Sequence, residues 1–289
     1  RVVVDASIYM YRNQAQDDLI GGMYAMISLL EHYGVELYFV FDGIPPSEKS
    51  GTLEERKTQR EFGLSELAYL EGIVSDVSAT EKKHRFARIQ RLRRQCARLN
   101  EMDIALVKEL LTYLGVGYMT ADGEAERLCA KLVIRNIADA CLSDDTDMFV
   151  YGCPRILRYL SVLGETVIHY DCAAMLKDIG ISQLDFRSVC VAAGTDYNQA
   201  THGFGELICE YGKFRDSGSI EQFADWLVAS NNQVSDECAF WTVYLMYDLA
   251  DVTVPKCLHR RGARRLGNPP QRDPDALRAM LSNYNFFFA

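Results

Sequence analysis

Short apolar runs alternate with helical stretches along the first half of the chain. Short, mostly apolar runs at 2–4, 35–41, 138–142 and 156–160 predict four strands, and residues 167–170 predict an edge strand. Between the first two runs, residues 17–33 carry apolar side chains three and four positions apart, which predicts a helix. Strands that alternate with helices are typical of an α/β protein with a mostly parallel central sheet flanked by helices.

The pattern changes twice after the second predicted strand. Residues 53–114 are mostly charged and favour helix, so they have too little apolar surface to be core throughout. We expect this block to project from the sheet as an arch, a lid or a helical pair. After about residue 172, helices are predicted at 182–193, 206–214, 220–229 and 237–249. We therefore expect an N-terminal α/β part over residues 1–170 and a C-terminal helical part over residues 171–289.

The composition excludes several classes of protein. A chain of 289 residues with 48% hydrophobic and 25% charged residues is neither disordered nor fibrous. No apolar run reaches the roughly 18 to 20 residues that a membrane span needs, so we expect no membrane partner. Nine cysteines occur singly, without a Cys-x-x-Cys pair, which argues against disulfides and zinc and for a reducing, intracellular compartment.

The distribution of charge matters more than its sum. A net charge of −9 argues against a nucleic-acid partner, whose phosphates require Lys and Arg. Lysine and arginine are nevertheless concentrated in residues 82–98, which contain no Asp or Glu, and in residues 256–265. Taken alone, each run is explained better by a solvated helix face than by a contact with nucleic acid.

Carboxylates follow the predicted strands at the point where each strand ends. Asp5 ends the first strand, Asp42 ends the second, and Asp145 and Asp147 come just after the third. Because ligands of open α/β sheets bind beyond the carboxyl ends of the strands, we expect these side chains to face one crevice. Three further carboxylates lie at the ends of helices, namely Glu124, Glu126 and Asp196.

Each of these acids alone could be a structural cap, but together they predict a metal site. So many carboxylates in one crevice would repel each other strongly unless multivalent cations compensated their charge. Oxygen ligands without His or Cys favour Mg²⁺ or Mn²⁺ over zinc. Two such ions about 4 Å apart are the usual apparatus for phosphodiester hydrolysis.

The acids stand within longer motifs. F-D-G-I-P-P-S-E-K-S-G-T-L-E-E-R at residues 41–56 places Lys49 seven and Arg56 fourteen positions after Asp42. The other motifs are V-D-A-S-I-Y-M-Y (4–11), G-E-A-E-R-L-C-A (123–130), S-D-D-T-D-M-F-V-Y-G-C-P (143–154), A-G-T-D-Y (193–197) and H-G-F-G (202–205). In this order and spacing, the motifs resemble the flap endonucleases of the structure-specific 5′ nuclease superfamily, the Rad2/XPG-like family. The resemblance covers residues 1 to about 225 and implies a PIN-like nuclease core with a helical arch.

The resemblance implies a role for each acid. One metal ion would be bound by Asp5, Asp42, Glu124 and Glu126, and the other by Asp145, Asp147 and Asp196. The expected ions are two Mg²⁺, for which Mn²⁺ can substitute. Asp144 occupies a position at which the family has a further acid that is not a ligand.

Cationic and aromatic residues also have implied roles. Lys49 and Arg56 would lie on the helix that gates the active site and would contact the scissile phosphate. Tyr11 matches an aromatic residue that stacks on the terminal base pair, with a buried core tyrosine as the alternative. Arg94 and Arg98, in the second half of the arch, would contact a threaded 5′ strand.

Residues 196–215 resemble the helix-two-turn-helix unit of the family. There, backbone amides around Gly203 and Gly205 and a bound K⁺ would hold one strand of duplex DNA. The sequence departs from the family because Glu206 follows the Gly-x-Gly turn, where Pro and Lys are usual, and this puts the duplex contact and the K⁺ site in doubt. The chain contains no sliding-clamp motif, so a clamp partner is not asserted, and we expect a monomer.

The main hypothesis is a 5′ flap endonuclease with 5′–3′ exonuclease activity. It would cut branched DNA in replication and repair, in the nucleus if the source is eukaryotic. A related 5′ exonuclease, a junction nuclease or an RNA nuclease is the enzymatic alternative. A nuclease-dead scaffold is another alternative, although such proteins usually lose acidic ligands and this chain has all seven. A metal-dependent phosphatase on an unrelated sheet would leave the arch without a role.

Overall fold

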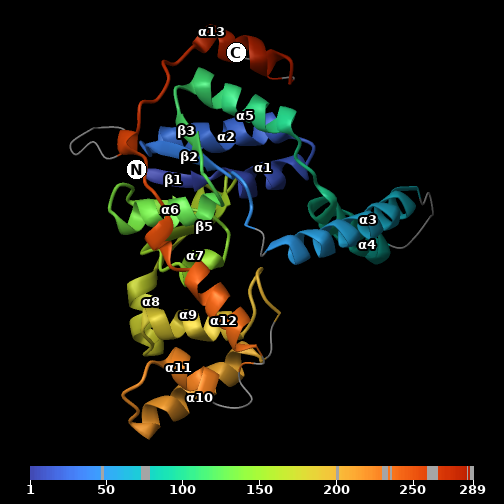
Figure 1. Cartoon of the computed structure of the whole chain (residues 1–289). Coiled ribbons are helices and arrows are strands. Elements are labelled where there is room, and N and C mark those ends of the chain that lie inside the picture. The colour runs from blue at the N-terminus through green and yellow to red at the C-terminus, as the bar shows by residue number, and fades with distance from the viewer. Residues whose placement is uncertain are drawn as a thin grey trace.

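The structure is a computed structural model that describes residues 1–46, 49–72, 79–199, 202–229, 234, 236–258, 266–284 and 286, without the side chains at 50, 52, 53, 56 and 79. A central sheet lies between helical layers, a helical pair extends to one side, and further helices continue below the sheet (Figure 1). Within the described residues, no helix combines the length and the apolar character that a bilayer span requires.

The strands form one mixed sheet in the order β3-β2-β1-β4-β5-β6. They are β1 (Val2–Asp5), β2 (Leu37–Phe41), β3 (Gly117–Thr120), β4 (Ala140–Leu142), β5 (Arg155–Ser161) and β6 (Thr166–Asp171). All neighbouring pairs are parallel except β5 and β6, which are antiparallel. The expected α/β fold with a mostly parallel sheet is confirmed, and β3 is a strand that the pattern did not predict.

Helices surround this sheet and extend beyond it. They are α1 (Ala6–Gln14), α2 (Leu19–His32), α3 (Ser50–Gly72), α4 (Ala79–Cys96), α5 (Glu101–Leu114), α6 (Ala125–Ile134), α7 (Asp147–Val150), α8 (Cys172–Ile179), α9 (Gln183–Ala192), α10 (Phe204–Ser217), α11 (Phe223–Ala229), α12 (Glu237–Met246) and α13 (Pro274–Ser282), with short 3-10 turns at Leu249–Asp251 and Lys256–Leu258. The four helices predicted after residue 172 correspond to α9, α10, α11 and α12.

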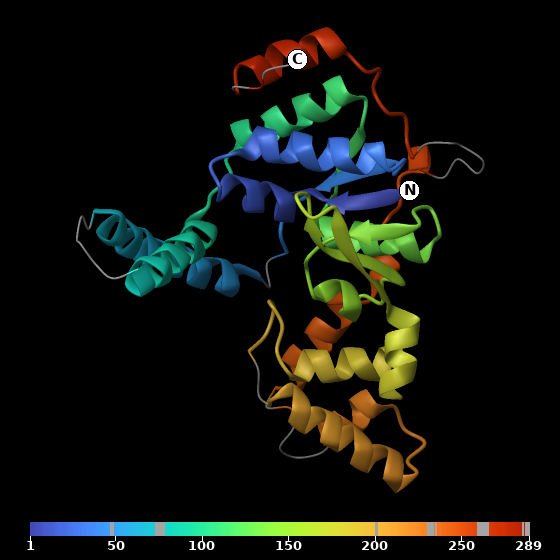
Figure 2. The same cartoon turned by 180° about the vertical axis from the view of Figure 1, so that it is seen from behind.

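Alternate side chains of the strands enter two cores, so both faces of the sheet are covered. Val3 of β1 packs with Val40 of β2 in one core, which includes the apolar face of α6. Val4 packs with Phe39 in the other core, which includes α2, α5 and α13. Figure 2 shows the second layer as α2, α5 and α13 stacked in succession on that side of the sheet. Burial on both faces explains why the central strands β1, β2 and β4 are almost continuously apolar, whereas β6 at the edge is largely exposed.

The block that we expected to project divides into two parts. Helices α3 and α4 lie side by side away from the sheet in both views (Figures 1 and 2). Arg88 of α4 pairs with Glu66 of α3 at 2.5 Å, and Arg93 pairs with Glu71 at 2.9 Å. Helix α5 instead packs into the core through a buried apolar face, and a capping box at Asn100 separates it from α4. Only α3 and α4 therefore form the projecting pair.

Candidate active site

The parallel strands deliver acids to one edge of the sheet. Asp5 is the last residue of β1, and Asp42 follows β2 directly. Asp145 and Asp147 follow β4, which pairs with β1 on the side opposite β2. Because all three strands run parallel, these side chains start from adjoining strand ends, as the sequence predicts.

The start of α6 brings two more acids to the same edge. Glu124 is the N-cap residue of α6, and Glu126 lies in the first turn of that helix. Asp42 accepts a hydrogen bond from the Ala125 backbone N–H at 2.8 Å. The β2 loop and the start of α6 are therefore held together.

Glycine is required immediately after Asp42. The Gly43 N–H donates to the Gly123 carbonyl at 2.7 Å, so the two loops run in contact. A Cβ atom at Gly43 would lie only 2.1 Å from the Ala121 carbonyl oxygen. Close backbone approach is thus the physical reason for glycine in the F-D-G motif.

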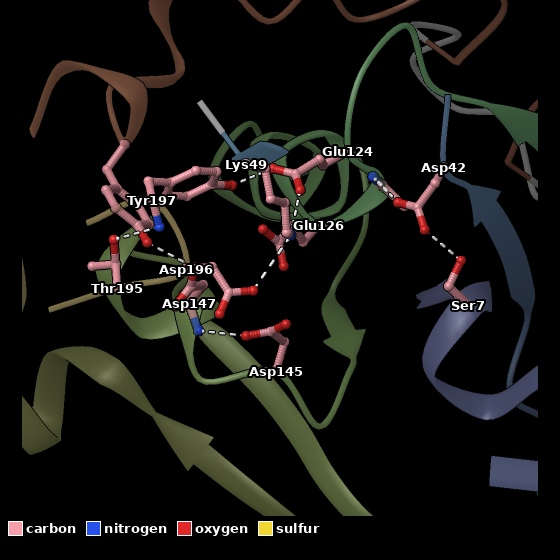
Figure 3. A network of polar contacts seen from close by, with 12 residues as sticks. Ser7, Asp42, Lys49, Glu124, Glu126, Asp145, Asp147, Thr195, Asp196 and Tyr197 are labelled. Carbon is pink, nitrogen blue, oxygen red and sulfur yellow. Dashed lines mark hydrogen bonds and ion pairs between the residues drawn. The ribbon is translucent and has the colours of Figure 1, made fainter. Parts of the chain in front are cut away.

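The loop after β4 is organised by short hydrogen bonds. Ser143 Oγ donates to Asp5 at 3.1 Å and accepts from the Asp145 N–H at 3.1 Å. Asp145 in turn accepts from the Asp147 N–H at 2.8 Å. Asp196 comes from a different segment, the loop after α9. Figure 3 shows Asp145, Asp147 and Asp196 near the two glutamates, with Asp42 set to one side beside Ser7.

The acids are close enough to perturb one another. Burial, with the charges of Asp42 and Asp145, raises the pKa of Asp5 to about 8. Burial and the charge of Asp145 raise the pKa of Asp147 to about 7. Burial also raises the pKa of Glu126 well above its ordinary value, and Asp145 and Asp147 add to this. Such shifts indicate a concentration of negative charge that a cation would relieve.

Lys49 supplies a positive charge within this group. Its Nζ atom lies 2.6 Å from Glu124 Oε1 and 3.5 Å from Asp196 Oδ2. The Lys49 side chain is 15% exposed and that of Glu124 8%, so the pair is largely shielded from water. Burial disfavours the charged amine, but the hydrogen bond and charge of Glu124, with Glu126 and Asp196, outweigh burial and raise the pKa of Lys49. The amine is therefore held as an ammonium ion.

Three tyrosines, which the sequence interpretation missed, donate hydrogen bonds to the acids. Tyr247 donates to Asp147 Oδ2 at 2.7 Å, Tyr151 donates to Glu126 Oε1 at 3.2 Å, and Tyr197 donates to Glu124 Oε2. Burial raises the pKa of each hydroxyl, so each phenol remains a donor. Tyr151 and Tyr197 lie within the quoted motifs, but no sequence signal distinguishes Tyr247 from a core tyrosine.

The other predicted contact residues lie near or along the helical pair. Tyr11 is 44% exposed, which contradicts the alternative of a buried core tyrosine. It lines a cavity of about 830 Å³ between α1, α3 and α4, together with Arg94. Arg94 and Arg98 are exposed and have no ion pair within the part of the chain that the structure describes. Arg56 lies on α3, but its side chain is outside the described residues.

The start of α10 carries the Gly-x-Gly turn. Gly203 is the N-cap residue and Gly205 lies in the first turn. Glu206 folds back and accepts a hydrogen bond from the Gly203 N–H at 3.1 Å, and it lies 3.6 Å from His202 Nδ1. A carboxylate of the chain thus caps the first turn of this helix. Residues 259–265, most of the second basic run, lie outside the described residues.

The donor set fits a hard divalent cation, although the side chains are not arranged around one. Among the described residues, no three His, Cys, Asp or Glu side chains have the geometry of a closed metal site. Donors of the chain engage the acids instead, as Ser7 does for Asp42 and Lys49 for Glu124. The side chains that converge here are carboxylates, with no His or Cys among them. Carboxylate oxygens are preferred ligands of Mg²⁺ and Mn²⁺.

Comparison with known proteins identifies the class of fold and site. Residues 1–62 match the XPG N-terminal domain and residues 115–196 match the XPG I-region. The solved catalytic core of Rad2 in complex with a DNA substrate is 25% identical, with a TM-score of 0.63 over 98% of this chain and 86% of that chain. Flap endonuclease-1 from Methanococcus jannaschii has the same fold at 21% identity, with a TM-score of 0.64 over 99% of this chain and 87% of that chain. The chain belongs to the Rad2/XPG-like family of nucleases, which require divalent metals generally.

Within this family, the chain is similar to flap endonuclease 1. The Xenopus tropicalis protein of that name is 29% identical over 249 residues, or 78% of this chain and 61% of the relative. The Osmerus mordax protein is 28% identical over 282 residues, or 89% of this chain and 70% of the relative. The chain spans 56% to 61% of the length of its three Xenopus relatives.

Proposed function

We propose that this chain is a divalent-metal-dependent nuclease that cuts branched DNA carrying a 5′ flap, in replication and repair. The observation that carries the proposal is the gathering of acids from separate segments at one sheet edge, beside a projecting helical pair whose helix α4 is rich in Lys and Arg. The DNA substrate in the Rad2 complex and the similarity to flap endonuclease 1 support the same conclusion.

The metals would be two Mg²⁺ ions, for which Mn²⁺ can substitute. One would be held by Asp5, Asp42, Glu124 and Glu126, and the other by Asp145, Asp147 and Asp196. When bound, the two ions would activate a water molecule and stabilise the attacking and leaving oxygens of the phosphodiester. For Asp42 to take part, its side chain must turn from Ser7 toward the others.

Lysine and arginine side chains of the protein would contact the phosphates of the DNA. Lys49 and Arg56, at the start of α3, would contact the scissile phosphate, which requires Lys49 to leave Glu124. Arg94 and Arg98 would contact the backbone of the 5′ strand, and Tyr11 would stack on the terminal base pair. Arg88 and Arg93, already paired with α3, would hold the arch together.

We expect the two parts of the chain to have different roles. Residues 1–170 would form the nuclease core with its arch, and residues 171–289 would form a helical part that contacts duplex DNA. Gly203 and Gly205, in the helix-two-turn-helix unit over residues 196–215, would contact duplex DNA. We expect this contact and any K⁺ site to be weak, because Glu206 places its own carboxylate at the first turn of α10. The protein would act as a monomer, without an assigned clamp contact, in a reducing compartment that is the nucleus in a eukaryote.

One assay tests the proposal directly. The purified protein with Mg²⁺ should cleave end-labelled single-flap and double-flap DNA in preference to bubble, four-way junction and RNA-flap substrates. Asp145→Ala should reduce turnover by orders of magnitude while binding of flap DNA in Ca²⁺ persists, because Asp145 would hold metal and not DNA. A preference for another substrate would favour the junction, exonuclease or RNA-nuclease alternative, and no cleavage at all would favour a scaffold.

Asp144→Ala is the matched control. The Asp144 Oδ1 atom accepts a hydrogen bond from the Tyr159 N–H at 2.7 Å, so this acid supports the second half of β5. Its loss should lower stability by about 1 kcal/mol and leave turnover nearly unchanged. Equal losses of turnover in Asp144→Ala and Asp145→Ala would contradict the assignment of metal ligands.

A further inference from the structure

Tyr247 connects the C-terminal helical part to the acidic site. It lies at the carboxyl end of α12, one hundred residues after Asp147. Its side chain is completely buried, and its hydroxyl donates to Asp147 Oδ2 at 2.7 Å. A buried hydroxyl needs a hydrogen-bond partner, and here that partner is a proposed metal ligand.

Tyr247 also packs against the other two tyrosines that reach the acids. Its ring centroid is 4.8 Å from that of Tyr151 and 5.8 Å from that of Tyr197. Tyr151 donates to Glu126 and Tyr197 donates to Glu124. The three rings therefore form one packed group, and each hydroxyl engages a different carboxylate.

A phenol affects a carboxylate differently from an ammonium ion. Lys49 neutralises the charge of Glu124 and so competes with any cation that would bind there. A neutral hydroxyl fixes the rotamer of the carboxylate without adding a positive charge, and the other carboxylate lone pairs remain available for a metal. Hydrogen bonds of this kind orient metal ligands, and their loss typically reduces metal affinity by about 10- to 100-fold.

We infer that Tyr247 is a positioning residue for the metal ligand Asp147, and that it stabilises Tyr151 and Tyr197 in contact with the two glutamates. This inference rests on the proposed function, because it assumes that the acids hold divalent metal. It assigns a role in the nuclease site to α12, which lies beyond the matched XPG regions.

The test is Tyr247→Phe in the full chain, with Tyr244→Phe as the matched control. Tyr244 is also buried and lies on α12. Its ring packs against the Arg187 guanidinium group and its hydroxyl forms a hydrogen bond with Ser188, so it contacts none of the proposed metal ligands. Both variants keep the aromatic ring and lose one hydroxyl. Mn²⁺ binding is measured by calorimetry in the absence of DNA, and thermal unfolding is measured in EDTA.

Tyr247→Phe should bind Mn²⁺ about 10- to 100-fold more weakly than the wild type, whereas Tyr244→Phe should remain within about twofold. Flap cleavage by Tyr247→Phe should recover toward the wild-type rate as the Mn²⁺ concentration rises. Wild-type Mn²⁺ affinity in Tyr247→Phe overturns the inference and leaves the proposed function intact. Failure of the wild type itself to bind Mn²⁺ overturns both. Equal losses of Mn²⁺ affinity in Tyr247→Phe and Tyr244→Phe would show that Tyr247 acts only through packing, and this result would also overturn the inference.

Discussion

Replacing Lys49 with methionine tests whether its ammonium group compensates the acids when no metal is bound. Methionine keeps an unbranched apolar side chain and removes the charge. Breaking a buried ion pair by deleting one partner typically costs about 3–5 kcal/mol. We expect the lower limit, about 3 kcal/mol, because the second partner, Asp196, is 34% exposed and water can solvate it.

The assay is thermal unfolding in EDTA, followed by titration with Mn²⁺. At about 2 °C per kcal/mol for a chain of this size, Lys49→Met should lower Tm by roughly 6 °C in EDTA. The experiment is best run above pH 8, because protonation of Asp147 and Asp5, with pKa values of about 7 and 8, would relieve the repulsion and mask part of the loss.

Metal should reverse the difference. If a bound divalent ion takes over the compensating role, the metal-bound wild type and variant should be nearly equal in stability. The thermodynamic cycle then requires the variant to bind Mn²⁺ more tightly by the same 3 kcal/mol or so, which is about 100-fold in Kd. The Tm gap should therefore close as Mn²⁺ approaches saturation.

Lys57→Met is the control, because Lys57 is an exposed residue of α3 that pairs with Glu54 at 3.4 Å. Exposed pairs contribute about 0–1 kcal/mol, so this variant should behave as the wild type. Two results would refute the reasoning: the same Tm for Lys49→Met and the wild type in EDTA, or an equal rise of both Tm values with Mn²⁺. Either would show that Lys49 does not compensate the negative charge of the acids.

Two predictions concern DNA binding. Arg94→Ala/Arg98→Ala should weaken flap binding and reduce the slope of log K against log salt by about one to two units, measured by fluorescence anisotropy with catalysis at saturation unchanged. Arg88→Ala, which breaks a pair within the arch, should not change that slope, and equal slopes in all three proteins would refute the phosphate contacts. Glu206→Gln should keep a capping side chain and strengthen duplex binding several-fold, by about 1 kcal/mol or less, because it removes a negative charge from the first turn of α10. Glu210→Gln, on the same helix, is the control, and unchanged affinity in Glu206→Gln would show that the cap does not oppose the duplex.

The sequence predicts the strands of this fold except β3, because the signal of the others is local. Runs such as residues 37–41 are continuously apolar and rich in aromatic and β-branched residues, as is typical of a strand buried on both faces. Helix α1 was not predicted, because β-branched and aromatic residues such as Ile8, Tyr9 and Tyr11 favour strands, yet the chain is helical from Ala6. Tertiary packing overrides propensity there. The common location of Asp5, Asp42, Asp145 and Asp147 was predictable because strand ends in a parallel sheet share one edge.

What the sequence could not predict is the set of groups that hold the acids. Tyr247 reaches Asp147 only because α12 folds back toward the sheet, and no local pattern encodes a contact across one hundred residues. The rotamer of Lys49 was equally unpredictable, since its motif implies a phosphate contact whereas the structure pairs it with Glu124. Hydrogen bonds across long sequence separations depend on the packed fold and not on spacing.

The proposed ligands and the groups that orient them differ in where they lie along the chain. All seven acids fall within the two segments that match XPG domains, residues 1–62 and 115–196. Tyr197 and Tyr247 lie beyond those segments. A protein can therefore keep the recognisable acids while its helical part changes the donors that set their rotamers. Since such donors tune metal affinity, relatives with identical acids but no hydroxyl at the position of Tyr247 should need higher divalent-metal concentrations for the same occupancy.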